Sequence, residues 1–110
     1  MITRKELLEN YSGKSEEQRT ELHRKYYAQF VTKGMKESIK QRIGIKRLLE
    51  SCDEHLNDIP LVIWDSLGSG YKKEVSNRLK EHGDFYSLAG SLCIFKEAAK
   101  QLIEEERKGG

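Results

Sequence analysis

The residues best suited to carry a function are six basic side chains crowded into one short segment of this chain of 110 residues. Between positions 33 and 47 they are accompanied by a single acidic residue, Glu37. Rows of ammonium and guanidinium groups suit the phosphates of nucleic acid, to which binding is largely electrostatic. The rival interpretation is an ordinary solvated helix face, which is common in proteins. We predict a nucleic-acid-binding helical face made of Lys33, Lys36, Lys40, Arg42, Lys46 and Arg47.

The layout around Gly44, with a helical pattern on each side, resembles the helix-turn-helix of DNA-reading proteins. Two positions depart from that motif. Lys40 stands where the family favours a small residue, and Glu50 stands where it favours an apolar one. The second helix would also carry Asp53 and Glu54, which repel phosphates. We therefore expect contacts to the nucleic-acid backbone rather than base-specific reading.

Side chains suited to metal binding or nucleophilic catalysis are present, but their spacing does not bring them together. The run from Cys52 to His55 places four such residues side by side, and neighbours on a helix point in different directions. The three histidines are scattered, and His23 falls on a polar helix face. The turn at 68–70 lacks the further glycine and lysine of a phosphate-binding loop. The sequence thus predicts a protein that is not an enzyme and has no metal, cofactor or small-molecule substrate.

Aromatic and apolar residues support an alternative function. Tyr27 directly follows Tyr26, so the two rings cannot be equally buried on one helix, and an exposed Tyr27 would suit a partner. Over 87–103 the side chains of Ile94 and Ile103 widen the apolar face beyond a single stripe. Tyr27 and Ile94 are therefore predicted partner contacts if the chain is a protein–protein adaptor, an inhibitor or a homodimer.

Composition limits the class of protein and its surroundings. Hydrophobic residues make up 36% and charged residues 35%, which is polar but above the apolar depletion of disordered chains. The longest dense apolar run, 59–64, is far shorter than the roughly 20 residues of a membrane span. The first residues are charged and carry no apolar stretch typical of a secretory signal, which favours a cytoplasmic location. We expect the two cysteines to be free thiols within apolar helical patterns rather than a disulfide.

Charge is unevenly distributed along the chain, although the net charge is only +2. Residues 1–49 hold 12 basic and 6 acidic side chains, whereas residues 50–110 hold 8 basic and 12 acidic ones. We expect the basic half to face a polyanion and the acidic half to keep the protein solvated.

Helical periodicity and capping motifs account for most of the chain. Thr3 with Glu6 and Ser15 with Gln18 have the spacing of capping boxes. A break is expected at Gly44, because the apolar spacing restarts there. A strand at 59–64 is the weaker interpretation of that apolar run, since no second strand could pair with it. We expect helices over 16–33, 45–56, 59–67, 71–82 and 87–105, with another between Gly34 and Gly44 and a turn at 68–70.

The predicted fold class is all-α: a compact bundle of about five to six short helices in a single domain, residues 1–110. Residues 1–14 should form a peripheral N-terminal helix and turn. Residues 106–110 should form a frayed tail.

Overall fold

Side-chain caps start the first three helices. The computed structural model describes residues 2–109. In it the Thr3 hydroxyl accepts a hydrogen bond from the Glu6 amide at the start of α1 (Arg4–Glu9). Ser15 and Gln18 cap one another reciprocally at the start of α2 (Glu16–Ala28), so the second capping box is confirmed. The Thr32 hydroxyl accepts from an amide in the first turn of α3 (Lys33–Arg42).

Four more helices follow, namely α4 (Ile45–Ser51), α5 (Leu61–Asp65), α6 (Gly68–Glu81) and α7 (Leu88–Gly109). The prediction of an all-α bundle is confirmed, because residues 2–109 contain seven helices, five of them at least seven residues long, and no strand.

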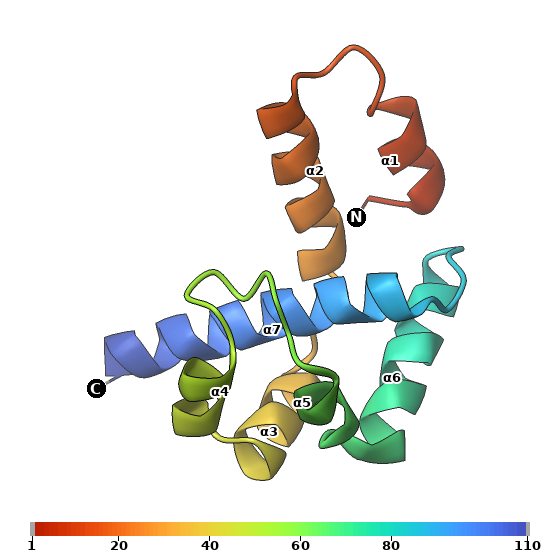
Figure 1. Cartoon of the computed structure of the whole chain (residues 1–110). Helices are drawn as coiled ribbons and strands as arrows, with labels where there is room; N and C mark the ends of the chain where they lie inside the picture. Colours follow the sequence, from red (N-terminus) through yellow and green to blue (C-terminus); the bar gives the residue numbers. More distant parts are fainter. Residues whose placement is uncertain (1, 110) are drawn as a thin grey trace.

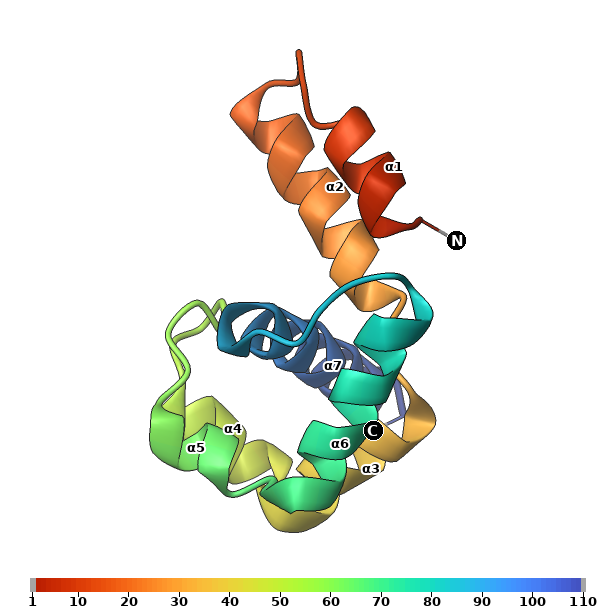
Figure 2. The ribbon, with the colours of Figure 1, turned by 90° about the vertical axis from the view of Figure 1, so that its right-hand side faces the viewer.

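Helix α7 lies at the centre of the molecule and organises the other elements (Figure 1). Helices α2, α3 and α6 all pack against it, and α1 packs on α2. Seen from the side in Figure 2, the α1–α2 hairpin projects away from the body formed by α3 to α7. A single helix thus supplies much of the shared core.

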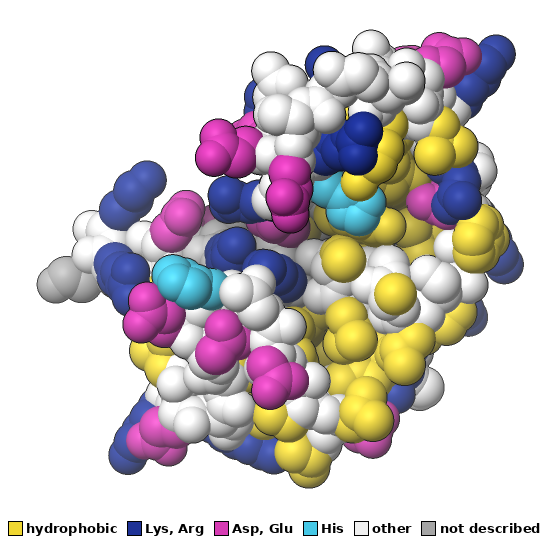
Figure 3. All heavy atoms as spheres, turned by 45° about the horizontal axis from the view of Figure 1, so that its top comes forward, with side chains coloured by type: hydrophobic (Ala, Val, Ile, Leu, Met, Phe, Trp, Pro, Cys, Tyr) yellow, Lys and Arg dark blue, Asp and Glu magenta, His cyan; other side chains and the backbone are white. Residues whose placement is uncertain are grey.

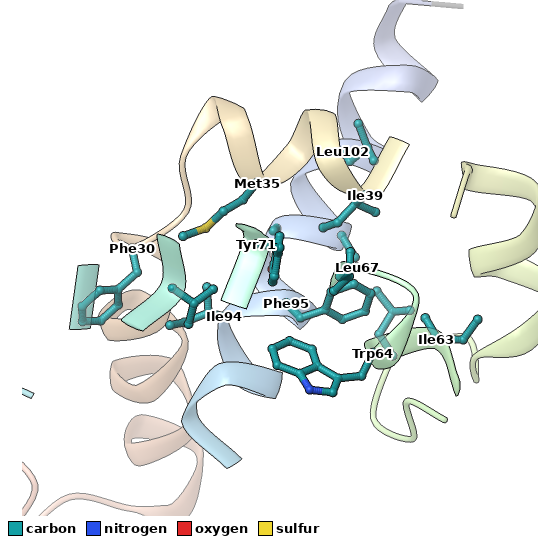
Figure 4. Close-up of a cluster of buried hydrophobic side chains, with 14 of the residues drawn as sticks. Phe30, Met35, Ile39, Ile63, Trp64, Leu67, Tyr71, Ile94, Phe95 and Leu102 are labelled. Carbon is teal, nitrogen blue, oxygen red and sulfur yellow. The ribbon is translucent and has the colours of Figure 1, made fainter. Parts of the chain in front are cut away.

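The core gathers side chains from every helix of the body (Figure 4). The ring of Trp64 meets those of Tyr71 and Phe95 edge-on, with centroids 5.8 Å and 6.4 Å apart. Ile94 and Phe95 of α7 are completely buried between these elements. Apolar burial on this scale is the main stabilising contribution to a domain of this size.

Several helix boundaries differ from those expected. Helix α2 ends at Ala28 instead of 33, since residues 29–32 turn the chain and Thr32 then caps α3. Helix α4 ends at Ser51 instead of 56. The chain turns after Ser51, and the buried Leu56 in this turn has a left-handed φ of 58°. Helix α5 is shorter than the expected 59–67. The break at Gly44 is confirmed, with φ at 83°.

The glycine triplet and the tail are also helical. Residues 68–70 were expected to be a flexible turn, but they form the first turn of α6. A frayed tail was expected at 106–110; residues 106–109 continue α7, and residue 110 lies outside the described residues. A salt bridge between Glu106 and Lys40 of α3, 3.3 Å long, helps to hold this last stretch beside α3.

Candidate nucleic-acid interface

Burial of one face of α3 presents its basic residues at the surface. Met35 and Ile39 are fully buried, and they fix α3 against the core. Side chains on the other faces of α3 then point away from the core. Of the six predicted cations, Lys36 is half-buried, and the other five are exposed: Lys33, Lys40, Arg42, Lys46 and Arg47.

Two of these cations face carboxylates of α7. The ammonium of Lys36 lies 2.6 Å from a carboxylate oxygen of Glu105, and that of Lys40 lies 3.3 Å from one of Glu106. A groove of about 490 Å³ runs between α3 and the C-terminal end of α7. Basic and acidic side chains both line it. Opposite charges at such distances attract even near water, so these lysines are partly neutralised within the chain.

Four cations are left without such partners. Among residues 2–109, no salt bridge involves Lys33, Arg42, Lys46 or Arg47. Three of these four lie on either side of the Gly44 turn. We call Arg42, Lys46 and Arg47 the α3–α4 corner.

Buried residues fix the position of this corner. Ile43 and Leu48 are buried on either side of it and attach both helices to the core. The Arg42 guanidinium packs over the start of α6, with Nη1 3.0 Å from where a Cβ on Gly68 would lie. The corner is therefore an exposed basic surface on a positioned backbone, which is suited to phosphate contacts.

The sequence did not indicate the carboxylates that pair with α3. Glu105 and Glu106 lie in a charged stretch that reads as a solvated tail, and they are 69 and 66 residues away from Lys36 and Lys40. No local spacing rule relates residues so far apart, because only the packing of α3 on α7 brings them together. The halves of opposite charge therefore meet at this groove.

The predicted partner contacts have different outcomes. Tyr27 is half-buried, and its ring meets those of His23 and Tyr26 edge-on at 5.1 Å and 5.0 Å. Ile94 is 0% exposed, so its predicted role as a surface contact is wrong. The wide apolar face of α7 is explained by its central position, since helices on several sides cover Ile94 and also Ile103.

Metal-binding side chains do not gather within residues 2–109. No group of three or more histidine, cysteine or carboxylate side chains is placed to hold a metal ion. Both cysteines are free thiols, and burial raises the pKa of Cys52 and of Cys93. A raised pKa leaves a smaller fraction of each thiol as the nucleophilic thiolate.

Helices within residues 2–109 all lack the combination of length and apolar character needed to cross a membrane. Comparison with known protein families, curated proteins and solved structures found no match.

Proposed function

We propose that this chain is a non-catalytic, cytoplasmic accessory protein that binds nucleic acid, or a complex containing it, through the basic surface of α3 and α4. The supporting observation is the set of four exposed cations without salt bridges among residues 2–109: Lys33, Arg42, Lys46 and Arg47. Unpaired surface cations can replace the counterions of a phosphate backbone, and the release of those counterions favours binding. Two free thiols agree with a reducing compartment.

Contacts to the phosphate backbone suit this surface better than base reading. Helix α4 has only seven residues, and its exposed side chains include Glu50 beside the basic pair. A helix that enters the major groove presents several side chains to base edges, and a carboxylate there repels the flanking phosphates. We therefore propose binding with little sequence preference.

The test is fluorescence anisotropy with labelled random-sequence single- and double-stranded DNA. The variant Arg42→Gln/Lys46→Gln/Arg47→Gln removes the α3–α4 corner and should weaken binding at low salt by about tenfold or more. The control Lys5→Gln/Lys25→Gln/Lys108→Gln removes the same number of exposed charges from α1, α2 and α7. Equal losses in both variants would mean that net charge, and not this surface, determines binding.

Binding of a protein partner is the second candidate function. Exposed apolar residues of α5, and not Ile94, support it. Leu61 and Val62 are adjacent on α5 and remain 59% and 63% exposed. Large apolar side chains that stay exposed together are a feature of association surfaces. If the chain is a homodimer, light scattering should give twice its 12.8 kDa, and Val62→Glu should restore the monomer mass. A monomer mass in the unmodified protein would remove the dimer form of this hypothesis.

A further inference from the structure

A second basic feature lies between α2 and α7, and none of the three residues of the α3–α4 corner lines it. A cavity of about 210 Å³ opens there, which we call the α2–α7 pocket. In Figure 3 the surface is hollowed below the α1–α2 hairpin, where basic and histidine side chains meet apolar ones. On α2 the lining residues Arg19, His23 and Tyr27 recur every fourth position and so share one face.

Aromatic rings form one wall of the pocket. The ring of His23 lies between those of Tyr11 and Tyr27, with centroids 6.2 Å and 5.1 Å away. Tyr11 belongs to the loop before α2, which folds back over that helix to complete the wall. These rings are tilted or edge-on to one another, so an incoming flat ring could contact the edge of one and the face of another.

Cations surround the same pocket. Arg19, Arg24 and Lys96 line it, against one carboxylate, that of Glu97. Arg24 holds Glu97 at 3.4 Å, whereas Arg19 lies over the Tyr11 ring at 5.2 Å and forms no salt bridge among residues 2–109. These charges are not fully neutralised, so the pocket presents an excess of positive charge.

A neighbouring lysine indicates the same positive potential. Burial, together with the nearby ammonium of Lys96 and the guanidinium of Arg24, lowers the pKa of Lys100. Bringing an anion among these groups would relieve their mutual repulsion. Arginine is the side chain best able to bind a phosphate through two parallel hydrogen bonds.

The size and lining of the pocket define the class of ligand. At about 210 Å³ it is smaller than the sites that enclose drug-sized molecules, so it would hold a flat ring and a charged group of a ligand whose remaining atoms stay in solvent. Glu97, only 7% exposed, adds a hydrogen-bond acceptor at the inner wall. A carboxylate-bearing peptide without an aromatic side chain would satisfy the cations but would not use the aromatic wall.

We propose that the α2–α7 pocket binds a nucleotide bearing a terminal phosphate, with the base against Tyr11, His23 and Tyr27 and the phosphate at Arg19 and Lys96. The nucleotide is either free or the phosphorylated end of a single strand. This site is separate from the surface in the proposed function, and neither one depends on the other.

The experiment is isothermal titration of the full chain with AMP, adenosine, inorganic phosphate, and a short single strand with or without a 5′-phosphate. AMP should bind at least about tenfold more tightly than adenosine or phosphate alone, because only AMP engages both parts of the site. Arg19→Gln/Lys96→Gln should weaken AMP binding by about tenfold or more. The control Lys25→Gln/Lys108→Gln, with the same charge change outside the pocket, should not.

The arms of the titration also identify the source of the nucleotide. If the 5′-phosphorylated strand binds and AMP does not, and this binding depends on Arg19 and Lys96, the pocket recognises strand ends. The α3–α4 corner variant should bind AMP normally, so failure of the proposed function would leave this result intact. The proposal is wrong if neither AMP nor the phosphorylated strand depends on Arg19 and Lys96, or if adenosine binds as tightly as AMP.

Discussion

The ammonium group of Lys36 lies 2.6 Å from a carboxylate oxygen of Glu105, which joins the basic half of the chain to its acidic half. Lys40 and Glu106 repeat the relationship one turn along α3. The acidic end of α7 thus occupies part of the surface that the sequence assigns to a polyanion. Any nucleic acid that reaches these two lysines must compete with carboxylates already beside them.

Removing that competition should strengthen binding. In Glu105→Gln/Glu106→Gln both lysines become available, so affinity for DNA should rise, and the plot of log affinity against log salt should steepen by up to about 1.8. Folding stability should change by less than about 1 kcal/mol, because Lys40, Glu105 and Glu106 are each about half exposed and water screens their charges. The anisotropy titration described above measures the effect, and unchanged affinity would show that Lys36 and Lys40 do not contact the nucleic acid.

Asp84 should make stability depend on acid pH. It accepts hydrogen bonds from the Tyr26 hydroxyl at 2.5 Å and from Arg4 at 2.6 Å, which join the loop between α6 and α7 to the α1–α2 hairpin. Burial opposes ionisation, but the hydrogen bonds from Tyr26, the Phe85 amide and Arg4 outweigh it and lower the pKa of Asp84. Its stabilising contribution is complete above the unfolded pKa of about 3.9 and is lost as pH falls through the lower folded value.

Asp84→Asn should therefore lower the free energy of unfolding at pH 7 by about 1–3 kcal/mol and flatten its decline below about pH 4. Denaturant titrations at several pH values provide the measurement. Asp58→Asn, at an exposed position, removes one carboxylate without breaking these hydrogen bonds and serves as the control. An equally steep acid decline in Asp84→Asn would show that other carboxylates cause it.

Two tyrosines should respond in opposite ways to the same substitution. The Tyr71 hydroxyl is buried without a hydrogen-bond partner among residues 2–109, so Tyr71→Phe should raise the free energy of unfolding by about 1 kcal/mol. Tyr26→Phe removes a donor to Asp84, so it should lower that free energy by about 1–3 kcal/mol. Thermal and denaturant unfolding of both variants decides the matter, and a loss of stability in Tyr71→Phe would mean that its hydroxyl has a partner.

Gly44 should be indispensable to the α3–α4 corner. With φ at 83° and ψ at 151° it lies in a region essentially restricted to glycine, so Gly44→Ala should cost about 1–3 kcal/mol. Gly70 lies within α6 with open space around its Cα, so Gly70→Ala should be neutral or stabilise by about 0.5–1 kcal/mol. Equal effects of the two substitutions would contradict this account of the turn.

Capping motifs and apolar spacing within the sequence predicted the helices well. The features that they did not predict depend on packing between distant parts of the chain. The caps at Thr3 and Ser15 and the break at Gly44 depend on residues within one or two turns, and all three are present. Ile94 was misassigned because the apolar width of a helix does not reveal how many neighbours cover it. The tail was misassigned because its partner on α3 is distant in sequence.

The candidate site was likewise predictable where it depends on local sequence and not where it depends on long-range packing. The row of cations could be read directly from the sequence, but which of them are free could not. The α2–α7 pocket was also beyond sequence reasoning, although Arg19, His23 and Tyr27 share a helix face at regular spacing. Only the packing of α7 and the loop carrying Tyr11 turns that face into a pocket.

The salt dependence of DNA binding tests the central claim most directly. Affinities of the unmodified protein and of Arg42→Gln/Lys46→Gln/Arg47→Gln for the same duplex should be measured across a series of salt concentrations. If the α3–α4 corner binds phosphates, the variant should give a slope of log affinity against log salt that is shallower by up to about 2.7, since each phosphate neutralised by a cation adds about 0.9. Identical slopes in the two proteins would show that the corner does not bind phosphates.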